Sequence, residues 1–228
     1  MSDPLRQCPL FAGLREDDFR KIRAIGLPRR IEKNEILFGE GQEAKGFYVI
    51  LSGKVKLYKV SPEGKEQILH VVSPPEAFAE AALFLEGTYP AFGEALADSQ
   101  LLFFPKRDFV HLIEKNPQLS INIIVSLSHF LKKFTSLIEE LSLKEVSSRI
   151  AKYLLDLSLK ASKEGKSPKE VELDLSKTQL ASKLGTISET LSRTLAKMKT
   201  RKIIDVKRSR ILILDREVLE ELASGLKL

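Results

Sequence analysis

The chain has 228 residues, a net charge of +6 and 43% hydrophobic residues, enough to bury one large core or two modest ones. No apolar run approaches the roughly 18 residues that span a bilayer. The N-terminus lacks a basic stretch followed by an apolar one, so we expect neither a membrane partner nor a signal peptide. The single cysteine, Cys8, excludes an intrachain disulfide and indicates a reducing, cytoplasmic location.

The hydrophobic pattern in the first part of the chain changes near residue 30. Residues 5–27 carry apolar side chains near helical spacing, which predicts short helical pieces. Between Arg30 and Phe109, short runs such as EILF, GFYVILSG, EQILHVV and SQLLFFP are bounded by Gly, Pro, Asn and Ser. This pattern is typical of a compact antiparallel β-domain, with SPEG at Ser61–Gly64 as a hairpin turn.

A long helix is predicted to begin at Asn116–Pro117, where the hydrophobic period changes from 2 to 3.6. A second stripe, Ile124, Leu131 and Ile138, runs beside a heptad seam. One stripe can cover the β-domain and the other an identical helix of a second subunit; a single wide core-facing stripe is the alternative. The seam, which we take as the homodimer interface, comprises Ile123, Leu127, Phe130, Phe134, Leu137 and Leu141.

A further helix is predicted to begin at Ser142, because Ser142–Glu145 has the S-x-x-E form of a capping box, and to end near Gly165. We therefore expect three parts. Residues 1–115 form a β-barrel domain with N-terminal helices, 116–141 a dimerisation helix, and 142–228 a C-terminal domain, which its later segments predict to be a winged helix-turn-helix.

The residues after Ser176 predict a helix-turn-helix. Ser176–Gln179 is a second capping box, Gly185 lies in the turn, and another helix begins near Ser188. On that helix, Leu191, Leu195 and Met198 share one face. The opposite face carries polar side chains suited to base edges in the major groove, and the predicted contacts are Ser188, Glu189, Ser192 and Arg193, with Thr178 on the preceding helix.

A basic wing is predicted to follow. Ile203–Leu214 reads as two strands about a basic turn, in which Lys207, Arg208 and Arg210 would meet phosphate. Residues 143–228 hold 19 basic against 12 acidic residues, and the segment from Arg193 to Arg210 holds eight basic residues and one acid. Such a concentration of positive charge indicates double-stranded DNA as the partner. The alternative is a generic helical hairpin with a solvated charged face.

The whole chain resembles the cyclic-AMP receptor protein and fumarate-nitrate regulator (Crp/Fnr) family over about residues 10–220. The stretch FGEGQEAKGFYVILSGKVKLYKVSPEGKEQIL has the family's turn glycines, Gly41, Gly53 and Gly64. ISETLSRTL is similar to the E-x-x-S-R recognition helix of the fumarate-nitrate branch. The resemblance implies an α+β chain with a cyclic-nucleotide-binding-like double-stranded β-helix (jelly roll). It also implies a dimer, a TTGA-type palindromic operator, contact with RNA polymerase and no enzymatic activity.

Two departures bear on the effector. The family's phosphate-gripping Arg-Ser pair is replaced by Pro90-Ala91, although Glu80 is kept, so we do not expect cyclic AMP to bind. One cysteine cannot supply an iron–sulfur cluster. The sequences FAEA, EELSLKE and ILDREVLE are similar to heme-associated nitric-oxide regulators, which implies heme and nitric-oxide sensing.

The resemblance places His70 in the effector pocket, where it would be a heme axial ligand. The alternative is a barrel histidine satisfied by a hydrogen bond. Of the other histidines, His129 would flank the subunit seam and His111 lie on the surface, while the segment around Cys8 could fold over the pocket. The expected pocket residues are His70, Val72, Phe78, Glu80, Leu83, Phe84, Leu127 and Phe130.

Two other classes of protein remain open at this point. A cupin-like metalloenzyme with a DNA-binding appendage would need clustered ligands, and three scattered histidines argue against it. An architectural DNA-binding protein would bind with strong salt dependence, little sequence preference and no effector response.

Overall fold

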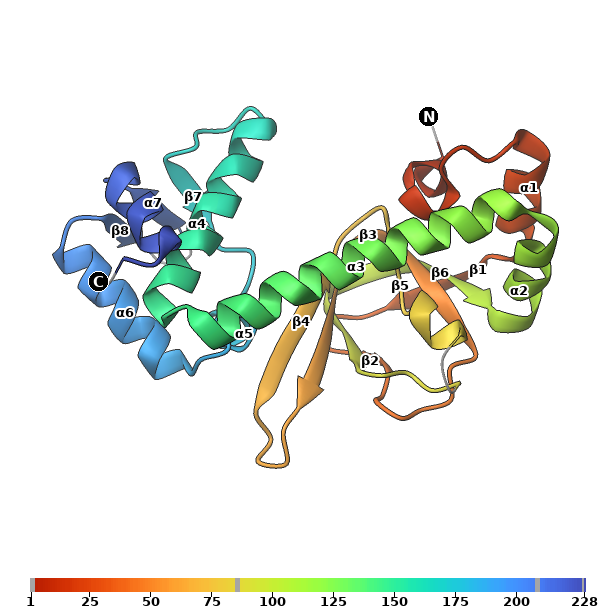
Figure 1. Cartoon of the computed structure of the whole chain (residues 1–228), viewed down its shortest axis with the longest axis horizontal. Coiled ribbons are helices and arrows are strands. Elements are labelled where there is room, and N and C mark those ends of the chain that lie inside the picture. Colours follow the sequence, from red (N-terminus) through yellow and green to blue (C-terminus); the bar gives the residue numbers. More distant parts are fainter. Residues whose placement is uncertain (1–2, 85–86, 208–209, 227) are drawn as a thin grey trace. The chain divides into compact units, whose positions relative to one another are not determined.

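The computed structural model describes residues 3–84, 87–207, 210–226 and 228. The chain divides into two compact units, Met1–Phe134 and Thr135–Leu228, which we call the N-terminal and C-terminal units (Figure 1). Their boundary lies inside one long helix, whereas the sequence placed it near residue 142.

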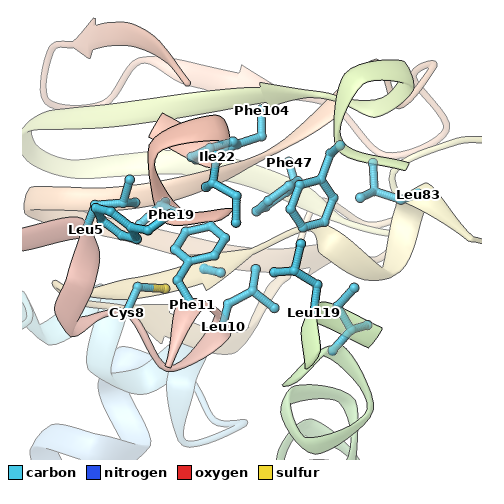
Figure 2. Close-up of a cluster of buried hydrophobic side chains, with 14 residues drawn as sticks. Leu5, Cys8, Leu10, Phe11, Phe19, Ile22, Phe47, Leu83, Phe104 and Leu119 are labelled. Atoms are coloured by element: carbon cyan, nitrogen blue, oxygen red, sulfur yellow. The ribbon is translucent and has the colours of Figure 1, made fainter. Parts of the chain in front are cut away.

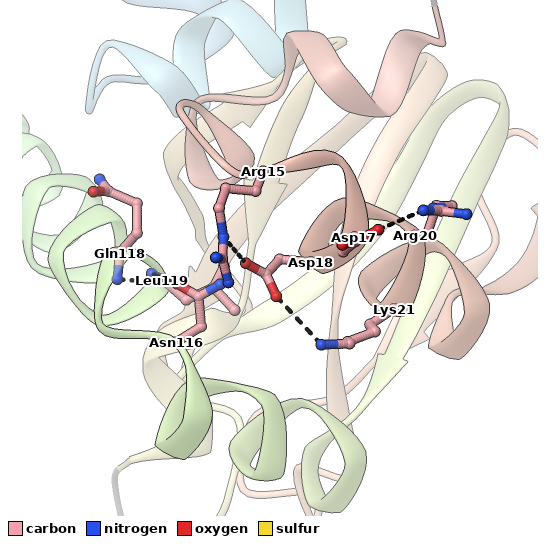
Figure 3. A network of polar contacts seen from close by, with 8 residues as sticks. All are labelled: Arg15, Asp17, Asp18, Arg20, Lys21, Asn116, Gln118 and Leu119. Atoms are coloured by element: carbon pink, nitrogen blue, oxygen red, sulfur yellow. Dashed lines mark hydrogen bonds and ion pairs between the residues drawn. The ribbon is translucent and has the colours of Figure 1, made fainter.

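The N-terminal unit begins with three short helices, as expected. These are η1 (Pro4–Gln7), η2 (Pro9–Phe11) and α1 (Glu16–Ile25). Polar contacts organise the start of α1, where Asp18 accepts hydrogen bonds from Arg15 Nε at 3.1 Å and Lys21 Nζ at 3.4 Å (Figure 3). The opposite face of α1 buries Phe19 and Ile22, so this segment closes one side of the core.

An antiparallel sheet of six strands forms the rest of this unit, in the order β1-β6-β3-β4, with β2 on β6 and β5 on β3. Two expected runs, GFYVILSG and KVKLYKV, form one continuous strand. Gly53 lies within it at φ +92°, and a Cβ there would come 2.1 Å from Ser99 Oγ of the neighbouring strand. The strands are β1 (Leu27–Ile31), β2 (Ile36–Phe38), β3 (Gly46–Val60), β4 (Glu66–Val72), β5 (Glu76–Phe78) and β6 (Phe92–Pro105).

The predicted turn at Ser61–Gly64 is confirmed. It joins β3 to β4, with Gly64 at φ +79° and its N–H donating to Ser61 O at 2.9 Å. A short helix, η3 (Glu80–Leu83), follows β5, and α2 (Lys106–Lys115) follows β6.

The long helix α3 (Pro117–Leu143) begins where the sequence predicted. Asn116 caps it, because its Oδ1 accepts from the N–H groups of Gln118 at 3.1 Å and Leu119 at 3.4 Å (Figure 3). By length and composition α3 could cross a membrane. Its N-terminal half instead places Leu119 and Ile123 in the core of the sheet unit.

That core joins all parts of the N-terminal unit. Leu5, Cys8 and Leu10 from the N-terminal segment meet Phe47 and Phe104 from the strands, and Leu119 from α3 lies beside them (Figure 2). Cys8 is fully buried in this core, which also contains the expected pocket residue Leu83. That its segment covers an effector pocket stays a prediction. A second cluster of buried side chains, which includes Phe38, Tyr48 and Phe78, packs on a different side of the sheet from the first cluster.

The C-terminal unit is the predicted winged helix-turn-helix with two additions. A strand, β7, pairs with β9 ahead of the motif, and a helix, α7, ends the unit. The proposed cap at Ser142 is wrong: α3 runs on to Leu143, and Glu145 takes the N-cap position of α4. The elements are α4 (Val146–Lys163), β7 (Glu170–Glu172), α5 (Lys177–Lys183), α6 (Ser188–Thr200), β8 (Ile204–Lys207), β9 (Arg210–Ile213) and α7 (Arg216–Ser224).

Candidate functional site

Helices α5 and α6 are held by the local features that the sequence indicated. Ser176 Oγ accepts from Gln179 N at 3.3 Å, and the Gln179 side chain accepts from Ser176 N at 3.0 Å, which completes the capping box. Gly185 has φ +61° in the turn between the helices. This conformation is readily adopted by glycine, so the turn can be tight.

Helix α6 separates an apolar face from a polar one. Leu191, Leu195 and Met198 are 0%, 5% and 0% exposed. Glu189, Ser192 and Arg193 are exposed, Ser188 is half-buried, and Thr178 is exposed at the start of α5. The polar side chains lie on the first turns of α6, the part of a recognition helix that meets base edges in the major groove.

Strands β8 and β9 form the wing, with Lys207 paired in register to Arg210. Both side chains are exposed, and Arg210 Nη1 lies 3.4 Å from Glu170 Oε1 on β7. The predicted contact Arg208 falls outside the described residues. The one acid of the basic segment, Asp205, pairs with Lys199 at 2.8 Å, which holds the pKa of this carboxyl below its usual value. Two cations of the segment, Lys199 and Arg210, are thus each paired with a carboxylate.

The predicted effector residue His70 makes two contacts inside the N-terminal unit. Its Nε2 lies 2.9 Å from Glu76 Oε1, and its ring meets Phe130 of α3 edge-on, with 5.6 Å between ring centroids. Lys133 of α3 lies 3.3 Å from the same Glu76 oxygen. Burial acts to raise the pKa of Glu76, but the contacts with His70 and Lys133 outweigh it and the pKa is lowered. These side chains connect the strands to α3.

Glu80 makes a second connection to the same helix. Its side chain is 2% exposed, and Ser126 Oγ of α3 donates to its Oε1 at 2.8 Å. Burial raises the pKa of Glu80, and the hydrogen bond from Ser126 opposes that rise only in part. The retained glutamate is thus engaged by the chain's own helix.

The other expected pocket residues do not all line one space. Val72, Phe78 and Leu83 are buried among packed side chains, and Phe78 stacks on Tyr48 with ring centroids 5.5 Å apart. Leu127 is half-buried against the core of Figure 2. Phe84 is 52% exposed. Phe84 is not packed into the core, and its place in a pocket wall stays a prediction.

The two stripes of α3 are buried in a different way from the expectation. Ile123, from the proposed dimer seam, is only 5% exposed inside its own unit's core, so it is not an interface residue. Leu127 and Phe130 of the same seam also pack within this unit, whereas Phe134 is 39% exposed and Leu137 and Leu141 are half-buried. The second stripe is the open one, with Ile124, Leu131 and Ile138 exposed at 63%, 69% and 65%.

Three residues of the effector region escaped the sequence reasoning: Glu76, Ser126 and Lys133. A signal for two of them was present, since Ser126, Phe130 and Lys133 are spaced i, i+4 and i+7 on one face of α3. That spacing predicts that the polar side chains of Ser126 and Lys133 lie beside the apolar stripe of the helix.

Comparison with known proteins identifies the family. Residues 28–116 match the family described as cyclic nucleotide-binding domain, and residues 148–222 match the Crp-like helix-turn-helix domain. The fumarate and nitrate reduction regulatory protein of Yersinia pestis is 33% identical over 199 residues, which cover 86% of this chain and 78% of that protein. This chain belongs to the Crp/Fnr family of transcription regulators.

Two further Crp/Fnr relatives support the assignment. The cyclic AMP receptor protein of Thermus thermophilus is 28% identical over 222 residues, covering 97% of this chain and all of that protein. The structure of a CooA mutant from Carboxydothermus hydrogenoformans superposes with a TM-score of 0.75 at 25% identity, covering 94% of this chain and 93% of that one. The chain is therefore a DNA-binding transcription regulator with an effector-binding domain, acts as a dimer and is not an enzyme.

Proposed function

We propose that this Crp/Fnr regulator reads a near-palindromic operator with TTGA-type half-sites through Glu189, Ser192 and Arg193. The observation that carries the proposal is the exposed polar row on the first turns of α6, opposite three buried apolar side chains. Arg can donate twice to guanine, and Glu can accept from cytosine N4–H. Lys207, Arg208 and Arg210 of the wing then contact phosphates and fix the register.

Selection from a randomised operator library tests this function. We expect the enriched sequences to contain two TTGA-type half-sites related by a two-fold axis, one for each recognition helix of the dimer. Enrichment of no sequence, with binding that depends only on salt, would instead favour an architectural DNA-binding protein.

The effector is proposed to act where the strands meet α3. His70 and Glu76 contact Phe130 and Lys133, and Glu80 contacts Ser126, so a ligand that separates these groups also changes how α3 is held. A shift transmitted along α3 to its junction with α4, after Leu143, would change the spacing of the two recognition helices. The coupling equals the ligand's difference in affinity for the two arrangements, typically about 1–3 kcal/mol.

Heme sensing nitric oxide is the effector chemistry that the resemblance implies, with His70 as an axial ligand. The residues around His70 do not fit a heme in this arrangement, because Nε2 is engaged by Glu76 and the ring packs on Phe130. Val72 and Phe78 beside it are fully buried. The proposed action of the effector on α3 therefore does not depend on heme.

An absorption spectrum of protein mixed with heme, with and without nitric oxide, decides between the effector hypotheses. Heme uptake with a spectrum altered by His70→Ala would establish His70 as a ligand despite its contacts. An unaltered spectrum would remove His70 as the ligand. No uptake would leave a different small apolar or anionic effector in the same region.

Contact with RNA polymerase is part of the same proposal, as is a cytoplasmic location. Both follow from a regulator that acts on DNA at promoters, and α3 is accounted for by packing and dimerisation instead of a membrane.

A further inference from the structure

A cleft of about 370 Å³ opens in the N-terminal unit between β1, β2 and the start of β3. It lies on the side of the second core cluster, among Ile31, Phe38 and Tyr48, whereas α3 packs on the first cluster. None of the proposed effector residues lines it. Its size is that of a small-molecule site.

Aromatic rings form the floor of the cleft. Phe38 stacks on Tyr89 with ring centroids 4.1 Å apart, and Tyr48 packs against Phe103 at 5.1 Å. Phe38, Tyr48 and Tyr89 are buried, while Phe103 keeps part of its surface exposed. The Tyr89 hydroxyl donates to Gly46 O at 2.8 Å, which anchors its ring to β3. A flat apolar surface of this kind suits a planar ligand ring.

Cations line the rim. Arg29, Arg30 and Lys45 are exposed there. Side chains alternate along a strand, so Arg29 shares a face of β1 with buried Ile31 and points to the aromatic floor. Its charge acts on the Tyr48 hydroxyl, whose pKa is raised by burial and lowered in part by Tyr89 and Arg29.

The carboxylates of the cleft make contacts with neighbours other than Arg29 and Arg30. Glu35 accepts a hydrogen bond from Glu32 N at 2.9 Å, and Glu43 lies 3.9 Å from Lys45. Within the described ranges, no acidic side chain pairs with Arg29 or Arg30. The Arg29 guanidinium beside the aromatic floor is thus available to an anion.

We propose that this cleft binds a small aromatic anion, with its ring on the Phe38–Tyr48–Phe103 floor and its phosphate, sulfonate or carboxylate group paired with Arg29. A charge-assisted pair with a guanidinium supplies direction, and ring contact supplies the apolar part of the binding. No proposed effector residue lines the cleft, although Phe78 packs on Tyr48 of its floor. The proposal does not depend on the proposed function.

Calorimetric titration with phenyl phosphate tests the proposal, with inorganic phosphate and benzyl alcohol as probes that lack the ring or the charge. We expect phenyl phosphate to bind more tightly than either. Arg29→Gln should weaken it by about tenfold or more, since the paired charge is lost. Arg29 is exposed, so an unchanged thermal midpoint should show that this variant folds.

Two control variants locate the site. Arg107→Gln removes an exposed arginine of the same unit that does not line the cleft, and His70→Ala alters the effector region. Both should bind phenyl phosphate as the unaltered protein does. The proposal is overturned by an absence of binding at millimolar concentration, by equal binding of inorganic phosphate, by full affinity in Arg29→Gln, or by a loss of affinity in His70→Ala.

Discussion

Arg193 and Lys207 are both exposed cations of the C-terminal unit, yet they lie on elements with different tasks. Arg193 is on the first turns of α6, so Arg193→Ala should cost roughly 1–3 kcal/mol of operator binding and relax preference at one base pair. Lys207 is in the wing, so Lys207→Ala should weaken binding to all DNA sequences alike. It should also lessen the slope of log affinity against log salt concentration by about 1.

Binding of each variant to an operator library at several salt concentrations measures both effects. The separation between base-reading and phosphate-contacting residues would be wrong if the two variants lost affinity with the same sequence profile.

Cys8 is fully buried in the core of the N-terminal unit, and burial raises the pKa of its thiol to about 12. The thiolate is the reactive form, so we expect almost no reaction with a disulfide reagent at pH 8 in the folded protein. Reaction should become rapid in denaturant. Fast labelling under native conditions would show that the N-terminal segment opens, contrary to the packing in Figure 2.

Glu80 should make the stability of the N-terminal unit depend on pH. Its pKa is raised in the folded state by burial, so the folded protein holds a proton that the unfolded chain releases above its ordinary value of 4.5. The contribution of Glu80 to stability is therefore full below that value and is lost as the pH rises through the raised folded pKa.

Glu80→Gln keeps an oxygen that can accept from Ser126 and removes the charge. It should raise the thermal midpoint most at neutral pH, and the gain should vanish below about pH 4.5. Glu32→Gln, at an exposed site of the same unit, serves as the control. A gain in thermal midpoint that did not change with pH would show that the gain does not come from the ionisation of Glu80.

At the scale of elements, we expect α3 to form the dimer through the stripe of Ile124, Leu131 and Ile138, because these apolar side chains are exposed. Leu131→Glu should give monomers that lose operator binding. The two-fold axis places the substitution in the interface twice, and burying an unpaired carboxylate costs several kcal/mol. Lys132→Glu, one position away on the exposed surface of α3, should stay dimeric. Sedimentation measures both, and an unchanged dimer for Leu131→Glu would refute this interface.

The sequence predicted the two stripes of α3 but misplaced part of the seam, since Ile123 packs in its own unit's core while Phe134 stays partly exposed. Both repeat every seven residues with similar apolar content, so spacing alone does not tell which one meets the strands. The decision depends on residues far away in sequence, such as Phe47 and Phe104, which pack around Ile123.

Long periodic segments and capped helices were predictable because their signals are local. The box at Ser176, the turn at Gly64 and the start of α3 at Pro117 are examples. Short strands such as β1, β5 and β7 were not predicted. They have three to five residues, and their pairing with β6, β3 and β9 is set by partners distant in sequence.

For the molecule as a whole, the exposed polar face of α6 was predictable and the contacts of the effector region were not. Exposed polar positions on α6 follow from helical period once its apolar face is known. The contacts Glu80–Ser126 and His70–Glu76–Lys133 join segments up to 57 residues apart and depend on the fold.

The choice of effector is a property of the whole molecule, and a negative prediction applies to it. Neither cyclic AMP nor cyclic GMP should bind at micromolar concentration, since Pro90-Ala91 stands where the family's phosphate-gripping pair would lie and Ser126 occupies Glu80. Calorimetry with each nucleotide checks this. Micromolar affinity would require another cation to meet the phosphate.

Strand β7 has a consequence for how such a regulator can change over evolution. It pairs with β9 through Glu170 to Glu172, so the wing is held from the α4 side of the unit and not by the exposed face of α6. Substitutions at Glu189, Ser192 and Arg193 can therefore alter which bases are preferred while the grip on the DNA backbone persists. A duplicated copy of the gene could acquire a new set of target genes in a few substitutions, because its product would still bind DNA after each substitution.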